Sequence, residues 1–292
     1  MMIGNKYLYI IGGPTASGKT ALAVNEAIRL NTVVISADSR QFYREMSIGT
    51  AKPSQQELDS VSHFFINNLS IHDEYDVGTY ESEVIHLLDD LYKKHDIVIM
   101  AGGSGLFIKA VTDGLDDFPE IESEVKEKCQ RILDNEGIEG LQQFVRQKDP
   151  QYFAEVDIQN PRRLLRAAEV ILQSGQTYSG FRKKSRKIRN FATIKYLINP
   201  ERELLYDRIN LRVLQMVEQG LEDEARQLYA YRHSKPLQTV GYQEWFDYFD
   251  GKITRNQAIE LIQQNTKRYA KRQLTWLRND PGWSTDLPGI LK

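Results

Sequence analysis

The chain has 292 residues but a single cysteine, Cys129, and its formal net charge is only −2. One thiol excludes an internal disulfide and a zinc site built on cysteines. No apolar run reaches membrane-spanning length, and the first one leads into a glycine-rich loop rather than a signal-peptide cleavage site. A near-neutral chain can bind nucleic acid only through a local basic patch. We therefore expect a cytoplasmic protein without a membrane partner, with one large domain or two modest ones.

The most specific local motif is Gly13–Thr20, which fits G-x-x-x-x-G-K-[ST] without a mismatch. A strand-like run, Tyr7–Ile11, precedes it, and a helical pattern, Thr20–Leu30, follows it. This context predicts a phosphate-binding loop in which backbone N–H groups and Lys19 face the anion and the Thr20 hydroxyl ligates Mg2+. The motif alone favours ATP but does not identify the phosphate. The predicted contacts are Gly13, Pro14, Thr15, Ala16, Ser17, Gly18, Lys19 and Thr20.

Two further strand-like runs, Asn31–Ala37 and Asp96–Ala101, end in segments that carry polar groups. Because parallel strands meet at their carboxyl ends, Asp38 should lie near the phosphate loop, where it could ligate Mg2+, accept a proton or only cap a turn. The second run is followed by Gly102–Ser104, without the Mg2+-binding Asp of a typical P-loop nucleotide hydrolase. This absence counts against an ordinary ATPase or GTPase. It leaves Ser104 as either a ligand contact or part of a glycine-rich turn.

The pattern changes to helices without strands between Phe118 and Phe181, and the strand-like run Ala192–Ile198 follows. The sequence therefore predicts an α/β fold with a nucleotide-kinase-like parallel sheet and flanking helices. We expect this P-loop catalytic core to comprise residues 1–117 and 182–292. Residues 118–181 are expected to form an all-α insertion domain.

Two of the predicted helices carry clustered basic residues. In the insertion, Arg162 and Arg166 share one face. Near the C-terminus, the helix Asn256–Arg278 interleaves Lys and Arg with Tyr269 and Trp276. Basic residues with aromatic and amide side chains are typical of RNA contacts, but a solvated amphipathic helix can have the same composition.

Several motifs together resemble the tRNA dimethylallyltransferase family in order and approximate spacing, over essentially the whole chain. They are Gly13–Thr20, Ser36–Ser39, Ile48–Pro53, Gly102–Leu106, Arg162–Glu169, Val240–Tyr242 and Lys271–Arg278. The resemblance implies a P-loop fold and Mg2+-dependent transfer of a dimethylallyl group from dimethylallyl diphosphate. The acceptor would be N6 of the adenosine at position 37 of tRNA, and the insertion would contact the anticodon stem-loop. We expect a monomer.

The resemblance also assigns roles to individual residues. Asp38 would be the general base, and Lys19, Ser104 and Arg212 would complete the catalytic set, with Arg208 the alternative to Arg212 for the diphosphate. Ser104 stands where the family more often has Thr, and Lys126 where many members have Arg. The implied tRNA contacts are Asp38, Ser39, Arg40, Gln41, Ser104, Lys126, Arg162, Arg163, Leu164, Leu165, Arg166, Gln238, Thr239, Val240, Gly241, Tyr242, Gln243, Lys271, Arg272, Gln273, Trp276 and Arg278.

Three other kinds of protein share parts of this pattern. An adenylate isopentenyltransferase, which attaches the same group to free AMP, ADP or ATP, would not need the insertion or the basic C-terminal helix. A small-molecule P-loop kinase leaves Lys271–Arg278 unexplained. A nucleotide-responsive RNA-binding protein without catalytic activity would not need Asp38 at a strand end.

Overall fold

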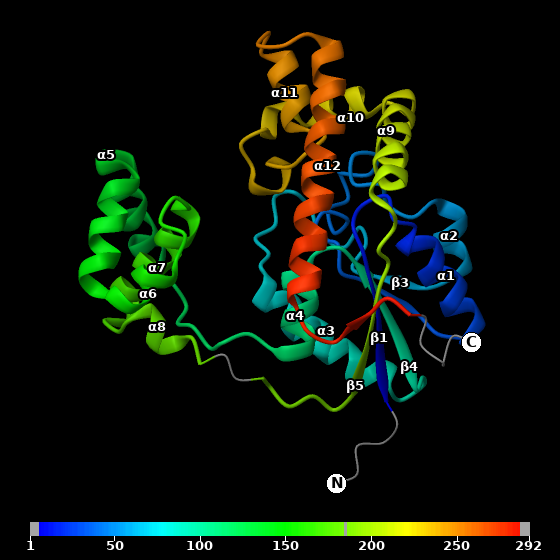
Figure 1. Cartoon of the computed structure of the whole chain (residues 1–292), viewed down its shortest axis with the longest axis horizontal. Coiled ribbons are helices and arrows are strands. Elements are labelled where there is room, and N and C mark those ends of the chain that lie inside the picture. Colours follow the sequence, from blue (N-terminus) through cyan, green and yellow to red (C-terminus); the bar gives the residue numbers. More distant parts are fainter. Residues whose placement is uncertain (1–5, 184–185, 287–292) are drawn as a thin grey trace. The chain divides into compact units, whose positions relative to one another are not determined.

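The computed structural model describes residues 6–183 and 186–286. They belong to two compact units (Figure 1). The first, the core unit, comprises residues 1–112 and 188–292, and the second, the helical unit, comprises residues 113–187. The insertion expected at residues 118–181 lies within the helical unit. Within the described ranges, no helix is long and apolar enough to span a membrane.

The core unit is built on a six-stranded sheet in the order β3-β2-β4-β1-β5-β6. All of its strand pairs are parallel, so the predicted α/β class with a parallel sheet is confirmed. The strands are β1 (Tyr7–Gly12), β2 (Val34–Ser36), β3 (His63–Phe64), β4 (Ile97–Gly102), β5 (Ala192–Leu197) and β6 (Trp283–Ser284). Because β1 lies between β4 and β5, the loop that follows it opens at the middle of the carboxyl edge.

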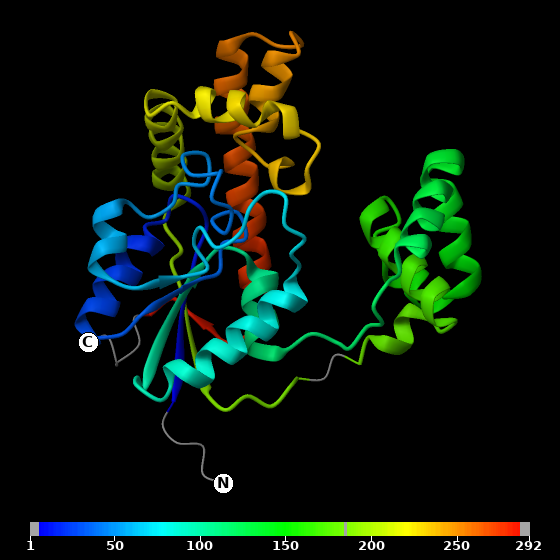
Figure 2. The same ribbon diagram turned by 180° about the vertical axis from the view of Figure 1, so that it is seen from behind.

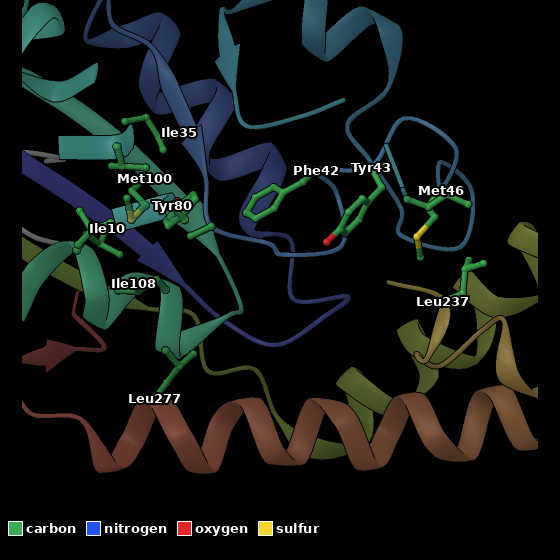
Figure 3. Close-up of a cluster of buried hydrophobic side chains, with 14 of the residues drawn as sticks. Ile10, Ile35, Phe42, Tyr43, Met46, Tyr80, Met100, Ile108, Leu237 and Leu277 are labelled. Carbon is green, nitrogen blue, oxygen red and sulfur yellow. The ribbon is translucent and has the colours of Figure 1, made fainter. Parts of the chain in front are cut away.

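Both faces of the sheet are covered, which explains why its central strands are continuously apolar. Successive side chains of a strand point to opposite faces, so Leu8 and Ile10 enter one core and Tyr9 and Ile11 enter the other. Figure 3 shows part of the first core, in which Ile10 lies near side chains from β2, β4 and α4.

Eight α-helices and two 3-10 helices are described in the core unit. They are α1 (Lys19–Arg29), α2 (Gln55–Ser60), α3 (Val77–Leu91), α4 (Gly105–Asp113), α9 (Arg202–Glu218), α10 (Leu221–Leu228), η1 (Tyr229–Tyr231), η2 (Lys235–Leu237), α11 (Gln243–Phe249) and α12 (Arg255–Asn279). Helices α9 and α12 pack against each other beyond the carboxyl ends of the strands (Figures 1 and 2). They therefore supply side chains to the edge where the phosphate loop lies.

The helical unit contains α5 (Ser123–Lys148), α6 (Pro150–Glu155), α7 (Pro161–Ser174) and α8 (Tyr178–Phe181). Within α5 the backbone of Gly137 is not helical, with φ at 69°, so this element consists of two helical segments that meet at a kink. Asn160 caps α7 by accepting a hydrogen bond from the N–H of Arg163, and Pro161 begins its first turn. Cys129 and Leu164 lie in the core of this unit.

The apolar side of α7 limits which of its residues can meet RNA. Leu164 is completely buried, so its predicted contact with tRNA does not fit the structure. The 3.6-residue helical repeat turns Leu164 inward while Arg162, Arg163 and Arg166 remain exposed. Leu165 is half-buried.

Candidate active site

The loop between β1 and α1 has the conformation of an anion-binding turn. Gly18 caps α1 in the left-handed region, with φ at 89°. At Gly13 a Cβ atom would lie 2.7 Å from Ser17 Oγ, so a larger residue would force the loop apart. The first N–H groups of α1 have no partner within the helix, and within the described chain Ser17 Oγ is buried without a hydrogen-bond partner. The loop therefore offers unsatisfied donors to a phosphate group.

Lys19 lies in this loop with its charge only partly compensated. Its Nζ atom donates a hydrogen bond to the carbonyl of Pro14 over 3.3 Å. Burial lowers the pKa of Lys19 to about 8, and the carboxylate of Asp38 acts in the opposite direction. A bound anion would restore the preference for the charged form.

Asp38 follows β2 and faces the phosphate loop, as expected from its strand-end position. Its Oδ1 atom accepts a hydrogen bond from the N–H of Arg40 over 3.2 Å, and its own N–H donates to Ser36 Oγ over 3.4 Å. These bonds hold the backbone in a tight turn. The carboxylate keeps further acceptor capacity toward the neighbouring cavities.

Arg212 reaches this region from α9. Its guanidinium donates to Thr15 Oγ1 over 3.3 Å and to the carbonyl of Ala51 over 3.5 Å. Burial lowers the pKa of Arg212, an effect that the nearby Asp38 opposes. Arg208, one turn earlier, is exposed and lines the same cleft. Both arginines therefore lie near the phosphate loop, and Arg212 donates a hydrogen bond to it.

Two cavities meet at these charged groups. The larger, a cleft of about 680 Å3, is lined by the phosphate loop, Asp38, Arg208 and Arg212. The smaller, of about 70 Å3, is lined by Thr15, Asp38, Arg212 and several apolar or aromatic side chains: Ile209, Val213, Met216, Val240, Ile262 and Tyr269. Asp38 can therefore face groups that enter from either cavity.

The glycine-rich segment after β4 supports the turn that carries Asp38. Ser104 Oγ accepts a hydrogen bond from the N–H of Ser39 over 3.1 Å and donates to Ser39 Oγ over 3.4 Å. The N–H of Ser104 also donates to the carbonyl of Ala37 over 3.1 Å. At Gly102 a Cβ atom would lie 2.2 Å from that same carbonyl oxygen. Ser104 therefore braces the turn that carries Asp38.

Gln41, predicted to contact tRNA, is buried and ties the Asp38 turn to the next loop. Its Nε2 atom donates to the carbonyl of Thr50 over 3.3 Å and to that of Ala51 over 3.1 Å. Lys52, in the same loop, donates to the carbonyl of Tyr43 over 2.6 Å, and burial lowers its pKa to about 8. The side chains of Gln41 and Lys52 therefore hold the loop in addition to lining the cleft.

One residue important to this loop was missed by the sequence reasoning. The carboxylate of Glu224, in α10, accepts hydrogen bonds from the N–H groups of Ser47, Ile48 and Gly49 at 2.8–3.0 Å. It also accepts one from the hydroxyl of Tyr242 over 2.6 Å. Glu224 stands in an acidic run, and nothing in that run distinguished it from an exposed carboxylate.

The segment Gln238–Gln243, predicted to contact tRNA, is only partly available at the surface. Tyr242 is completely buried, because it packs on Gly49 and bonds Glu224. The buried N–H of Gly241 donates to Glu244 over 2.8 Å. Gln243 is exposed, while Gln238, Thr239 and Val240 are half-buried. Direct RNA contact by Tyr242 therefore does not fit this structure.

Helix α12 presents two different faces. Lys271, Arg272 and Arg278 are exposed on the outer face. Gln273 is only 6% exposed, and the half-buried Trp276, one turn after Arg272, has a ring that would collide with a Cβ atom at Gly105. Predicted RNA contacts of this helix thus fall on both sides of it, and Gln273 does not fit that role. Lys126, in the helical unit, is exposed.

Comparison with known proteins identifies the family. Residues 41–280 match the family described as IPP transferase. The chain is 47% identical over 277 residues to tRNA dimethylallyltransferase of Christiangramia forsetii, with 95% of this chain and 92% of the relative covered. The enzyme of that name from Flavobacterium psychrophilum is 48% identical over 278 residues, covering 93% of this chain and 91% of its own.

Solved structures resemble the chain over nearly its whole length. The full-length tRNA isopentenylpyrophosphate transferase from Bacillus halodurans gives a TM-score of 0.68 at 36% identity, covering 96% of this chain and 89% of that one. A eukaryotic dimethylallyltransferase acting on tRNA gives a TM-score of 0.80 at 26% identity, covering 93% of this chain and 70% of the other.

The lowered pKa of Lys19 predicts a pH-dependent affinity for a diphosphate. Below about pH 8 the lysine is charged in the free protein, and above it the proton is lost unless the anion holds it. Affinity should therefore fall as pH rises through about 8, by up to about tenfold per pH unit. Calorimetric titration with dimethylallyl diphosphate measures this slope.

The matched control for this titration is Lys19→Arg, whose guanidinium stays charged throughout the range. Ionisation of the ligand is common to both proteins and cancels in the comparison. Equal slopes above pH 8 for the wild-type protein and Lys19→Arg would contradict the assignment.

Proposed function

Because this chain belongs to the IPP transferase family, we propose that it is a tRNA dimethylallyltransferase. It transfers a dimethylallyl group from dimethylallyl diphosphate to N6 of the adenosine at position 37 of tRNA. The observation that carries the proposal is the position of Asp38 at two cavities, together with Arg212 and the phosphate loop. A carboxylate base beside a cationic leaving-group site is what an alkyl transfer to an amine requires.

The charges of the site support a displacement reaction. The lone pair of the N6 amino group attacks the terminal allylic carbon, the bond from that carbon to the diphosphate oxygen breaks, and diphosphate leaves with both electrons. Asp38 accepts the proton that the amine loses. Lys19 and Arg212, with the donors of the phosphate loop, stabilise the charge that grows on the leaving group.

The loop also fits the Mg2+ that the family resemblance implies. Within the described residues, no group of three His, Cys, Asp or Glu side chains could hold a metal. Mg2+ at phosphate sites often takes one or two protein oxygens, with substrate phosphates and water as its other ligands. Thr20 and Asp38 line the same cavity, and Thr20 is the hydroxyl of the motif. When bound there, the ion would neutralise diphosphate charge.

Both units carry exposed basic residues that suit an RNA backbone. In the helical unit these are Arg162, Arg163 and Arg166, and in the core unit they include Lys271 and Arg272. We assign the helical unit, including residues 118–181, to the anticodon stem-loop. An adenine that reaches Asp38 must leave the stack of RNA bases, because its N6 atom is inaccessible within that stack.

The proposed activity is tested by incubating the protein with labelled dimethylallyl diphosphate and Mg2+, with unmodified tRNA and AMP offered in parallel. Label should enter tRNA and be recovered as N6-(dimethylallyl)adenosine. Label in AMP alone would instead indicate an adenylate isopentenyltransferase. In a parallel reaction that supplies ATP as the phosphate donor, phosphate transfer to AMP without alkylation of tRNA would indicate a kinase.

Replacing Asp38 with Ala should reduce the turnover of tRNA by about 10²–10⁴-fold, because the base that accepts the N6 proton is removed. Affinity for tRNA should stay close to that of the wild-type protein. Single-turnover kinetics and filter binding measure the two quantities. Asp38→Asn keeps the size of the side chain and should be impaired to a similar degree; normal turnover in either variant would exclude Asp38 as the base.

Replacing Lys271 or Arg272 with Ala should weaken tRNA binding and make it less dependent on salt. Each lost phosphate contact should lower the slope of log affinity against log salt by about 0.7–0.9. Lys93→Ala is the control, because Lys93 is an exposed lysine near the amino end of β4, at the opposite edge of the sheet. An unchanged slope in the α12 variants would remove these residues from the RNA interface.

A further inference from the structure

A single buried amide of α12 joins two of the loops at the carboxyl edge of the sheet. The N–H of Thr15, in the phosphate loop, donates to Gln273 Oε1 over 2.9 Å. Gln273 Nε2 donates to the carbonyl of Gly103, after β4, over 3.1 Å. These loops are distant in sequence from Gln273. The side chain uses both its acceptor and one of its donors to hold them together.

The two loops leave no space for a side chain at position 103. A Cβ atom at Gly103 would lie 2.2 Å from Gln273 Nε2 and 3.0 Å from the carbonyl oxygen of Gly13. Glycine at this position therefore lets the amide approach the backbone closely. The contact therefore requires both glycine at position 103 and glutamine at position 273.

Each hydrogen bond of the Gln273 side chain reaches a loop that supports a group of the proposed reaction. The hydroxyl of Thr15 accepts a hydrogen bond from Arg212, so the position of Thr15 affects where the guanidinium lies. Gly103 precedes Ser104, whose hydroxyl holds the N–H of Ser39 next to Asp38. The amide thus connects the supports of the leaving-group site with those of the proposed base.

The helical repeat explains why this glutamine is not part of the outer face. Ala270 and Leu277, three residues before and four residues after Gln273, are both completely buried. Lys271 and Arg272 lie on the exposed side. Gln273 is therefore on the packed face of α12, although its neighbours in sequence are on the basic face.

We propose that Gln273 is a positioning residue for the transfer reaction. Its amide fixes the phosphate loop against the Gly103 loop, so that diphosphate affinity and the alignment of Asp38 depend on it. This inference rests on the proposed function of the same site. It gives the Lys271–Arg278 motif a role in donor binding as well as in RNA binding.

The first test replaces Gln273 with Met, which has a similar length but neither amide group. Inorganic pyrophosphate affinity, measured by calorimetry, should fall about tenfold, and the KM for dimethylallyl diphosphate should rise similarly, because two buried hydrogen bonds are lost. Affinity for tRNA should not change. Arg272→Met makes the same replacement on the outer face and should do the reverse, weakening tRNA binding but not pyrophosphate binding.

The second test uses Gln273→Glu and covers the case in which the methionine variant does not fold. A protonated glutamic acid can accept from Thr15 and donate to Gly103 as the amide does, whereas a carboxylate cannot donate. Burial raises the pKa of a carboxyl group, so the protonated fraction of this variant should grow as the pH falls. The pyrophosphate affinity of Gln273→Glu relative to wild type should therefore increase between about pH 8 and pH 6. A purely structural fault would lower stability but leave the pyrophosphate affinity of the folded protein at the wild-type value.

The outcomes separate this inference from the proposed function. Wild-type pyrophosphate affinity in Gln273→Met, or a flat relative pH profile in Gln273→Glu, would overturn the positioning role. Weakened tRNA binding with normal pyrophosphate binding would place Gln273 at the RNA interface instead. A wild-type protein that binds pyrophosphate but alkylates no tRNA would overturn the proposed function while leaving the loop contact testable by binding.

Discussion

The site depends on how closely the loops that follow β1, β2 and β4 approach one another. At Gly102, any Cβ atom would meet the carbonyl of Ala37 at 2.2 Å, which would push the Asp38 turn away from β4. A Cβ atom at Gly103 would likewise collide with Gln273 and with the carbonyl of Gly13, which would push α12 away from the phosphate loop. Adjacent parallel strands bring these loops to one edge, but only glycine lets their backbones lie close enough to share hydrogen bonds.

This closeness creates an electrostatic arrangement suited to an anion. Lys19 and Arg212 are cations in surroundings that lower both of their pKa values by burial, and Asp38 is the carboxylate that opposes both shifts. Two cations beside one carboxylate leave an excess of positive charge. A diphosphate would remove that excess, so donor binding and the charged state of Lys19 should support each other.

Much of the fold and part of the site could be predicted because the signals are local. The phosphate loop lies between a strand and a helix, and Asp38 directly follows a strand; both patterns are contained in short segments. The roles of Gln273, Tyr242 and Leu164 could not be predicted in this way. The family resemblance implied RNA contact for these residues, but burial depends on which helix face packs and on partners distant in sequence, such as Glu224 for Tyr242.

The dependence of burial on the helix face also shows how one motif would contribute to both substrate sites of the proposed reaction. Along Lys271–Arg278, a helix turns about 100° per residue, so adjacent side chains point in different directions. Lys271 and Arg272 reach the surface, while Gln273 reaches the phosphate loop. The linear sequence of the motif does not show these directions, so all of its residues were assigned to one binding function. Helix α12 therefore contributes residues to both binding sites of the proposed reaction.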